Sequence, residues 1–170
     1  QQALAAERLL AEVEAARVQA IAEEAYVYGL PLVMTYGVMY AFSLDPTSSQ
    51  YKGPMNQLNC SATLYTPADK EVPFANNDTL YCIGWLDLRT EPVVITVPAV
   101  EKARYRSVML TDMSSVNYGL IGTRTTGNGA GDFLIVGPDW QGATPKGIAG
   151  VYRSTTQFSS AITRTELKNK

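Results

Sequence analysis

The first quarter of the chain has the hydrophobic pattern of a helix. Residues 3–28 include neither Gly nor Pro and are rich in Ala, Leu and Glu, which predicts one helix of about 40 Å at about 1.5 Å per residue. Apolar residues recur along one side at Leu9, Val13, Ala16 and Ala20. The second half is apolar on two sides. We therefore expect the helix to run into the core and to pack on its own domain rather than on a partner.

The run Gly29-Leu30-Pro31 predicts a helix boundary, because Gly suits the position after a helix and Pro suits the first turn of the next. We expect a second helix at 32–43, with its methionine and aromatic side chains in the core. Residues 45–49 have the composition of a loop.

Beyond residue 61 the pattern changes to that of short strands separated by Pro and Gly. Short connections favour antiparallel pairing. We expect an α+β fold: a helical segment at 1–43, then a β-rich domain at 44–170 that forms a mainly antiparallel sheet or sandwich. A last helix is predicted at 159–168. The predicted strands are 62–65, 80–88, 93–97, 105–112, 116–121, 133–136 and 148–153.

Composition excludes several classes of partner. The chain has 170 residues, of which 46% are hydrophobic and 18% charged, as in one ordinary domain with a core. A net charge of −2 without a basic run gives no electrostatic footprint for nucleic acid. No uninterrupted apolar run reaches the roughly 18 residues of a membrane span, so we expect none.

The chain contains no histidine, which excludes a Ser-His-Asp or Cys-His centre and a zinc site with imidazole ligands. We expect neither a metal nor a cofactor. Only Cys60 and Cys82 carry thiols. They could form one disulfide or remain two reduced, buried thiols, and the residues alone do not separate these alternatives.

A polar cluster at 76–79 enters an aromatic strand, and this stretch is the first candidate site. Asn76, Asn77, Tyr81 and Trp85 are candidate ligand-binding residues. The alternative is a turn in which Asn and Asp bond the local backbone. Tyrosine and tryptophan side chains could also form a surface on which a carbohydrate stacks, although such residues more often fill a sheet core.

Acidic residues at strand ends supply the candidate catalytic groups, Asp78, Asp87 and Asp132, two of which could act as general acid and base if they converge. Arg124 could bind a carboxylate or phosphate, although an ion pair with Asp132 across a hairpin is favoured. The glycine-rich run 127–131 lacks the third Gly of a dinucleotide loop and precedes a strand. A hairpin connection is therefore expected there.

Two triplets, at Asn59 and Asn77, match the N-glycosylation pattern, which matters only in a protein secreted by a eukaryote. The chain starts without methionine, as a processed, exported protein would. A processed amino terminus is compatible with a secreted, extracellular or periplasmic location.

Several runs together resemble one family. They span nearly the whole chain in the family's order, and on them the chain is similar to the DUF1254 domain, whose function is uncharacterised. The resemblance implies the amino-terminal half of a two-domain protein, normally followed by a β-rich DUF1214 domain, and implies export. The runs are 24–32, 76–81, 85–88, 92–94, 104–105, 122–127, 131–133, 137–140 and 164–165.

The chain departs from this family at its cysteines. Relatives tend to carry a His near the position of Cys60 and a Ser at that of Cys82, which puts an enzymatic role in doubt here. Two cysteines at the altered positions favour a Cys60–Cys82 bridge, worth up to about 3 kcal/mol in the chain-entropy model. We expect an exported structural, assembly or ligand-binding module whose first helix can dock a partner protein or a second copy. The alternative is a hydrolase that acts on a carbohydrate or small ester.

Overall fold

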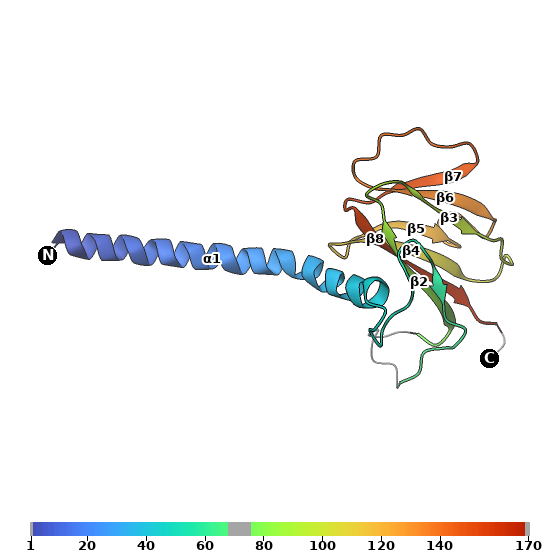
Figure 1. Cartoon of the computed structure of the whole chain (residues 1–170), viewed down its shortest axis with the longest axis horizontal. Helices are drawn as coiled ribbons and strands as arrows, with labels where there is room; N and C mark the ends of the chain where they lie inside the picture. Colours follow the sequence, from blue (N-terminus) through green and yellow to red (C-terminus); the bar gives the residue numbers. More distant parts are fainter. Residues whose placement is uncertain (1, 68–75, 169–170) are drawn as a thin grey trace.

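The computed structural model describes residues 2–67 and 76–168. Its elements are the helix α1 (Gln2–Met39) with a closing π-helical turn, η1 (Tyr40–Leu44), followed by eight strands (Figure 1). The strands are β1 (Asn59–Cys60), β2 (Thr79–Asp87), β3 (Val93–Val97), β4 (Arg106–Asp112), β5 (Asn117–Gly122), β6 (Gly131–Val136), β7 (Ile148–Arg153) and β8 (Phe158–Glu166). The predicted α+β class is confirmed.

The strands form two sheets. One has five strands in the order β1-β2-β8-β4-β5, all antiparallel, and the other has three in the order β3-β6-β7. Alternate residues of each strand face the opposite sheet, so the inner faces bury one apolar core. Leu110, Ile121 and Ile135 in this core are completely buried.

A second, smaller core lies on the outer face of the five-stranded sheet. Met39 and Phe42, at the end of the helical segment, pack there on Ile83 and Trp85 of β2. The Thr35 and Ser115 hydroxyls, 2.9 Å apart, add a polar contact between α1 and the turn after β4. These contacts fix the end of α1 on the sheet.

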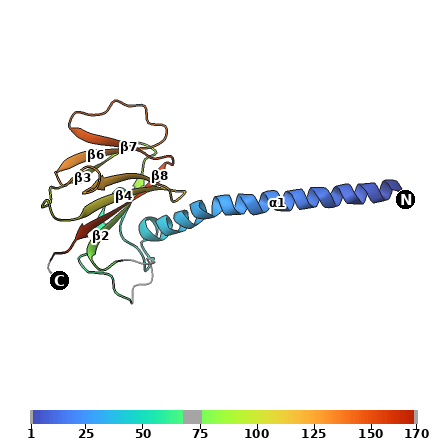
Figure 2. The same cartoon turned by 180° about the vertical axis from the view of Figure 1, so that it is seen from behind.

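The rest of α1 projects away from the sheets (Figures 1 and 2). Every residue of 2–38 except Gly29 and Thr35 is exposed. The expectation that this helix packs along its own domain is therefore wrong. The sheets bury their apolar faces on each other, and the outer face receives only the last turns of the helix.

One helix replaces the two that were predicted. Pro31 lies inside α1, and no break occurs at Gly29. The local signals for a boundary were present, but helical geometry continues through them to Met39. Proline removes one backbone donor and does not by itself end a long helix.

Residues 158–166 are a strand and not the predicted helix. β8 lies between β2 and β4, where nine residues pair with β2 and seven with β4. Its inward positions include the small residues Ser159 and Ala161, so the strand lacks the alternation of large apolar residues that would have revealed it. The Thr and Ile residues of this segment were the available signal.

Two further details differ from expectation. β6 and β7 pair in parallel, joined by a connection that contains no helix. Residues 62–65 form no strand, with a bend at 62–63, and the short strand of that region is β1. The other predicted strands agree with β2 to β7 within two residues at each end.

The helical segment Gln2–Leu44 is long and apolar enough to cross a membrane, with an 18-residue window of mean hydropathy 1.4. The sequence reading missed this because Pro31, Thr35 and Gly37 interrupt the apolar run. A signal sequence or a core helix meets the same criterion. The absence of a span therefore stays a prediction.

Candidate functional site

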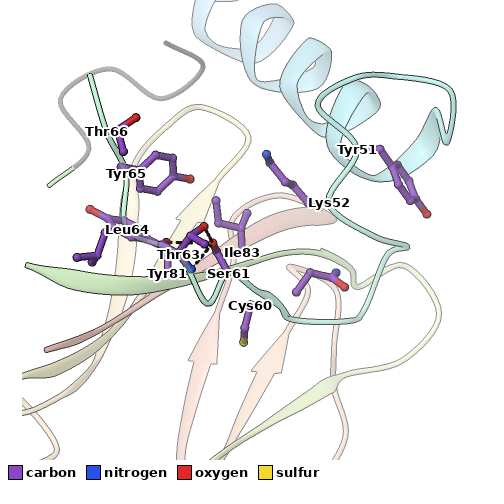
Figure 3. Close-up of a pocket in the computed structure, with 11 residues that line it drawn as sticks. Tyr51, Lys52, Cys60, Ser61, Thr63, Leu64, Tyr65, Thr66, Tyr81 and Ile83 are labelled. Carbon is purple, nitrogen blue, oxygen red and sulfur yellow. Dashed lines mark hydrogen bonds between the residues drawn. The ribbon is translucent and has the colours of Figure 1, made fainter. Parts of the chain in front are cut away.

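The candidate site is a pocket of about 530 Å³ between β2 and the segment 51–66 (Figure 3). This volume lies in the range of small-molecule sites. The lining residues that the structure describes include three tyrosines and three aliphatic hydroxyls, and no carboxylate. They are Tyr51, Tyr65, Tyr81, Ser61, Thr63 and Thr66.

The alternation of side chains along β2 determines which residues form the floor of the pocket. Tyr81 and Ile83 face outward, away from the sandwich core, while Leu86 faces inward. Asn59 of β1 lies opposite Ile83 and lines the same pocket. The pocket therefore occupies the part of the outer face that α1 leaves uncovered.

Tyr81 is the most constrained polar residue of the pocket. Its side chain is 6% exposed, and the Tyr65 ring meets it edge to face at 5.2 Å. The Arg164 guanidinium lies over its ring at 5.3 Å, and the Asn76 amide donates to its hydroxyl at 3.4 Å.

Two opposing effects act on the Tyr81 phenol. Burial raises its pKa, but hydrogen bonds from Arg164, Asn76 and Thr79, together with the Arg164 charge, outweigh burial, so the pKa falls below its ordinary value. The phenol is thus a stronger acid and a better hydrogen-bond donor than an exposed tyrosine. It can bind an acceptor oxygen of a ligand.

Local hydrogen bonds shape one wall of the pocket and the entrance to β2. The Ser61 and Thr63 hydroxyls lie 3.0 Å apart, and the Thr63 amide donates to Ser61 Oγ at 3.2 Å. At the entrance to β2, Asn76 Oδ1 accepts from the amides of Asp78 and Thr79, each at 3.1 Å. The turn interpretation of this polar cluster is confirmed, because the Asn76 side chain bonds to the local backbone.

The Cys60–Cys82 disulfide joins β1 to β2. The two cysteines are directly opposite in the register, with Cα atoms 3.9 Å apart. The bridge favoured by the family resemblance is therefore confirmed. Such a bond persists in an oxidising environment.

The predicted acidic residues do not share a site. Asp87 forms a bidentate contact with Arg89, with distances of 2.9 and 2.7 Å, and this holds the pKa of Asp87 below its ordinary value. Asp132 lies on the other sheet and accepts from Thr96 Oγ1 at 2.6 Å. Asp78 precedes β2, at the opposite end from Asp87 and about 30 Å away at ~3.3 Å per residue.

Arg124 does not pair with Asp132. Its guanidinium lies 5.6 Å from the centre of the Tyr105 ring, so the predicted ion pair is wrong. The expected hairpin is absent too, since β5 and β6 belong to different sheets. This geometry gives no support for a ligand-binding role of Arg124.

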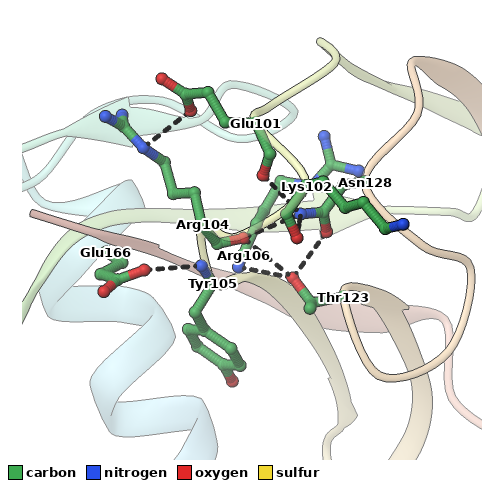
Figure 4. A network of polar contacts seen from close by, with 8 residues as sticks. All are labelled: Glu101, Lys102, Arg104, Tyr105, Arg106, Thr123, Asn128 and Glu166. Carbon is green, nitrogen blue, oxygen red and sulfur yellow. Dashed lines mark hydrogen bonds and ion pairs between the residues drawn. The ribbon is translucent and has the colours of Figure 1, made fainter. Parts of the chain in front are cut away.

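The glycine-rich connection is instead an anchored structural loop (Figure 4). Asn128 Nδ2 donates to the backbone carbonyls of Glu101 at 2.8 Å and Arg104 at 2.9 Å. Arg106, which sequence reasoning missed, is buried, and its guanidinium donates to the carbonyls of Pro98, Gly127 and Gly129. The basic side chain beside the glycine run therefore binds backbone carbonyls rather than a phosphate.

Trp85 provides no surface for sugar stacking, whereas Trp140 is half-buried and lines a second, smaller pocket of about 270 Å³. Trp85 is 5% exposed and belongs to the small core under α1. The Arg153 guanidinium lies 5.9 Å from the centre of the Trp140 ring, and Gly142 approaches the same indole so closely that a Cβ there would lie 2.8 Å from Nε1. The aromatic side chains that line pockets are therefore the three tyrosines of the candidate site and Trp140.

The remaining predicted polar positions have local roles. Asn59 is half-buried and donates to the Gln57 carbonyl at 3.2 Å, whereas Asn77 is exposed. Glycosylation at either stays a prediction. Within residues 2–67 and 76–168, no three His, Cys, Asp or Glu side chains gather as a metal site would require.

The profile of the family described as "Protein of unknown function (DUF1254)" matches residues 55–170. The chain belongs to the DUF1254 family. This match covers the disulfide, the strands β1 to β8 and the pocket lining except Tyr51 and Lys52. No curated protein matches the chain significantly.

The chain is also similar to solved structures. The VPA0106 protein from Vibrio parahaemolyticus is 29% identical, with a TM-score of 0.71 over 88% of this chain and 33% of that one. An uncharacterised protein from Burkholderia cenocepacia is 16% identical, with a TM-score of 0.47 over 66% of this chain and 31% of its own. The DUF1254 chain thus spans about a third of each relative. The expected second β-rich domain stays a prediction.

Proposed function

We propose that this DUF1254 domain is a non-catalytic binding module whose ligand occupies the pocket between β2 and the segment 51–66. The observation that supports this function is the lining, which combines tyrosine rings with several hydroxyls and no carboxylate among the described residues. A carbohydrate fits this chemistry, because sugar C–H faces pack on aromatic rings and sugar hydroxyls bond to polar side chains.

The proposed module is exported. The Cys60–Cys82 disulfide supports an oxidising compartment, such as a periplasm or the extracellular space. The apolar helical segment near the amino terminus is also compatible with a signal sequence. Export would place the pocket where free glycans occur.

The hydrolase alternative has weaker support. A glycosidase needs two carboxyl groups within about 10 Å of each other. Asp78 and Asp87 lie at opposite ends of β2, and Asp132 lies on the second sheet. None of these three residues lines the pocket.

Binding can be tested with a panel of neutral mono- and oligosaccharides, followed by saturation-transfer NMR and calorimetry. Tyr65→Ala should weaken binding about tenfold, because it removes an aromatic contact. Tyr28→Ala is the matched control, since Tyr28 is 89% exposed on α1, away from the pocket. Absence of any binding sugar, or an equal loss in both variants, would contradict the proposal.

Assembly is the second candidate, and the exposure of α1 favours it. Leu9, Leu10, Val13 and Ile21 are each more than half exposed, which is costly for a helix in water. In this role α1 packs on α1 of a second copy. Light scattering at increasing protein concentration should show a dimer that Leu9→Glu/Val13→Glu abolishes, and a monomer throughout would exclude this role.

A further inference from the structure

The disulfide lies next to the pocket, whose lining includes Cys60. Asn59 is paired with Ile83 and Cys60 with Cys82, and adjacent residues of a strand point to opposite faces. Asn59 and Ile83 line the pocket. The Cys60 sulfur points away from the pocket side chains (Figure 3).

The disulfide is the strongest connection between the pocket wall and the sheet. β1 has only two residues and lies at the sheet edge. Beyond it, the Ser61 amide donates to the Tyr81 carbonyl at 2.9 Å and the Tyr65 ring meets that of Tyr81 edge to face at 5.2 Å, whereas the Ser61 and Thr63 side chains bond within their own turn. An edge strand this short has little independent stability.

We infer that Cys60–Cys82 is a thiol-exchange site whose reduction by a dithiol opens the pocket. The inference rests on the proposed function only where it concerns ligand binding, because the redox step itself needs no ligand. In the oxidised form the bridge holds Ser61 to Thr66 against β2. In the reduced form this wall separates from Tyr81, and the binding site is lost.

Accessibility determines which sulfur reacts. Cys60 is exposed and Cys82 is half-buried, so an external thiolate reaches Cys60 Sγ first. The reaction partner is therefore a protein with two thiols that recognises an exposed disulfide at a sheet edge.

The exchange proceeds in two balanced steps. The first thiolate of the reductant attacks Cys60 Sγ, a mixed disulfide forms, the Cys60–Cys82 bond breaks, and Cys82 leaves as a thiolate that takes a proton from water. The second thiolate of the reductant then attacks its own first sulfur and releases Cys60 as a thiolate, which is protonated. The protein gains two electrons and two protons, and the reductant becomes a disulfide.

The site of attack can be tested by trapping. The full chain is incubated with a thioredoxin-type reductase whose second cysteine is replaced by serine, and the adduct is mapped by mass spectrometry. We expect the mixed disulfide on Cys60. No adduct, or an adduct on Cys82 alone, would overturn the assignment.

The effect on the pocket is measured by amide hydrogen exchange with and without dithiothreitol. We expect exchange in residues 61–66 to accelerate about tenfold or more on reduction, while β4 and β8 keep their protection and report an intact fold. The double variant Cys60→Ser/Cys82→Ser should show the exchange rates of the reduced protein, and dithiothreitol should not change them. Unchanged exchange in 61–66 after complete reduction would overturn the inference, whatever the binding experiments show.

Sugar binding separates this inference from the proposed function. If an oxidised chain binds a sugar, reduction should abolish that binding. If no sugar binds but the exchange result holds, the proposed ligand class fails and the redox-controlled opening stands. A reduced chain that binds as tightly as the oxidised one would refute the control of the pocket.

Discussion

Arg164 lies directly across from Tyr81 in the register of β8 and β2, with its guanidinium 5.3 Å from the centre of the tyrosine ring. The two residues are 83 positions apart in the sequence. This pair connects the centre of the five-stranded sheet to the pocket floor, and it determines how the phenol ionises.

Removal of the arginine should raise the pKa of Tyr81. In Arg164→Leu, burial still disfavours the phenolate, while the charge and hydrogen bond that favour it are gone. A ¹³C NMR titration of the tyrosine Cζ signals measures the shift. Arg124→Leu, which removes the guanidinium over Tyr105, is the control and should leave the Tyr81 titration unchanged.

The same pair predicts how stability varies with pH. Because the folded pKa of Tyr81 lies below the ordinary 10.0, the unfolded chain binds more protons between these two values. The stabilisation is complete above the unfolded pKa and is lost as the pH falls through the folded pKa. Urea unfolding of the wild type and Tyr81→Phe should therefore differ increasingly as the pH rises across this window. A constant difference would contradict the pKa assignment.

Arg106 should be essential for the loop that it anchors. Arg106→Met leaves the carbonyls of Pro98, Gly127 and Gly129 without their donor, so we expect a loss of about 2–4 kcal/mol in the free energy of unfolding. Arg124→Met, on an exposed side chain, should cost less than about 0.5 kcal/mol. Chemical denaturation distinguishes the two, and equal losses would show that Arg106 has no special role.

Gly122 should tolerate no side chain. Its φ is 138°, and a Cβ there would overlap the backbone carbonyl of Arg106. Gly122→Ala should lower the free energy of unfolding by more than about 2 kcal/mol. Gly129→Ala is the matched control, because no atom lies within 4 Å of its added Cβ, and it should be neutral within about 0.5 kcal/mol. A thermal unfolding series compares them, and a tolerated Gly122→Ala would refute this close approach.

Two methionines of α1 should differ sharply. Met39 is completely buried on the sheet, whereas Met34 is 61% exposed. Met39→Ala should cost about 2–5 kcal/mol through loss of burial and the resulting cavity. Met34→Ala should cost less than about 0.5 kcal/mol in the monomer. A large effect at Met34 in denaturant titrations would mean that α1 is covered along its length in solution.

The sequence predicted the elements whose signals are local. Strands β3 and β7 have the predicted bounds, because Pro or Gly punctuation flanks strand-forming residues. The turn at Asn76 follows from a side chain that bonds its own neighbours. The disulfide came from comparison with a known family, since spacing alone left it open.

Where partners are distant in the chain, sequence reasoning failed. β8 was predicted as a helix because its inward Ser159 and Ala161 give no apolar alternation. The buried Ser159 is satisfied by residues distant in the chain, because its Oγ lies 2.6 Å from the Tyr118 hydroxyl and donates to the Thr111 carbonyl at 3.1 Å. The candidate acids were likewise grouped by residue type, but their separation depends on the sheet to which each strand belongs.

Local backbone and turn chemistry thus suffice for the α+β class, the positions of most strands and the polar entrance to β2. The order of the strands, the approach of Arg164 to Tyr81, the pocket and the projection of α1 depend on which faces bury each other. Burial is a sum over the whole chain, and small inward residues acquire their role only from the strands that pack beside them. Tertiary structure alone therefore assigns the site.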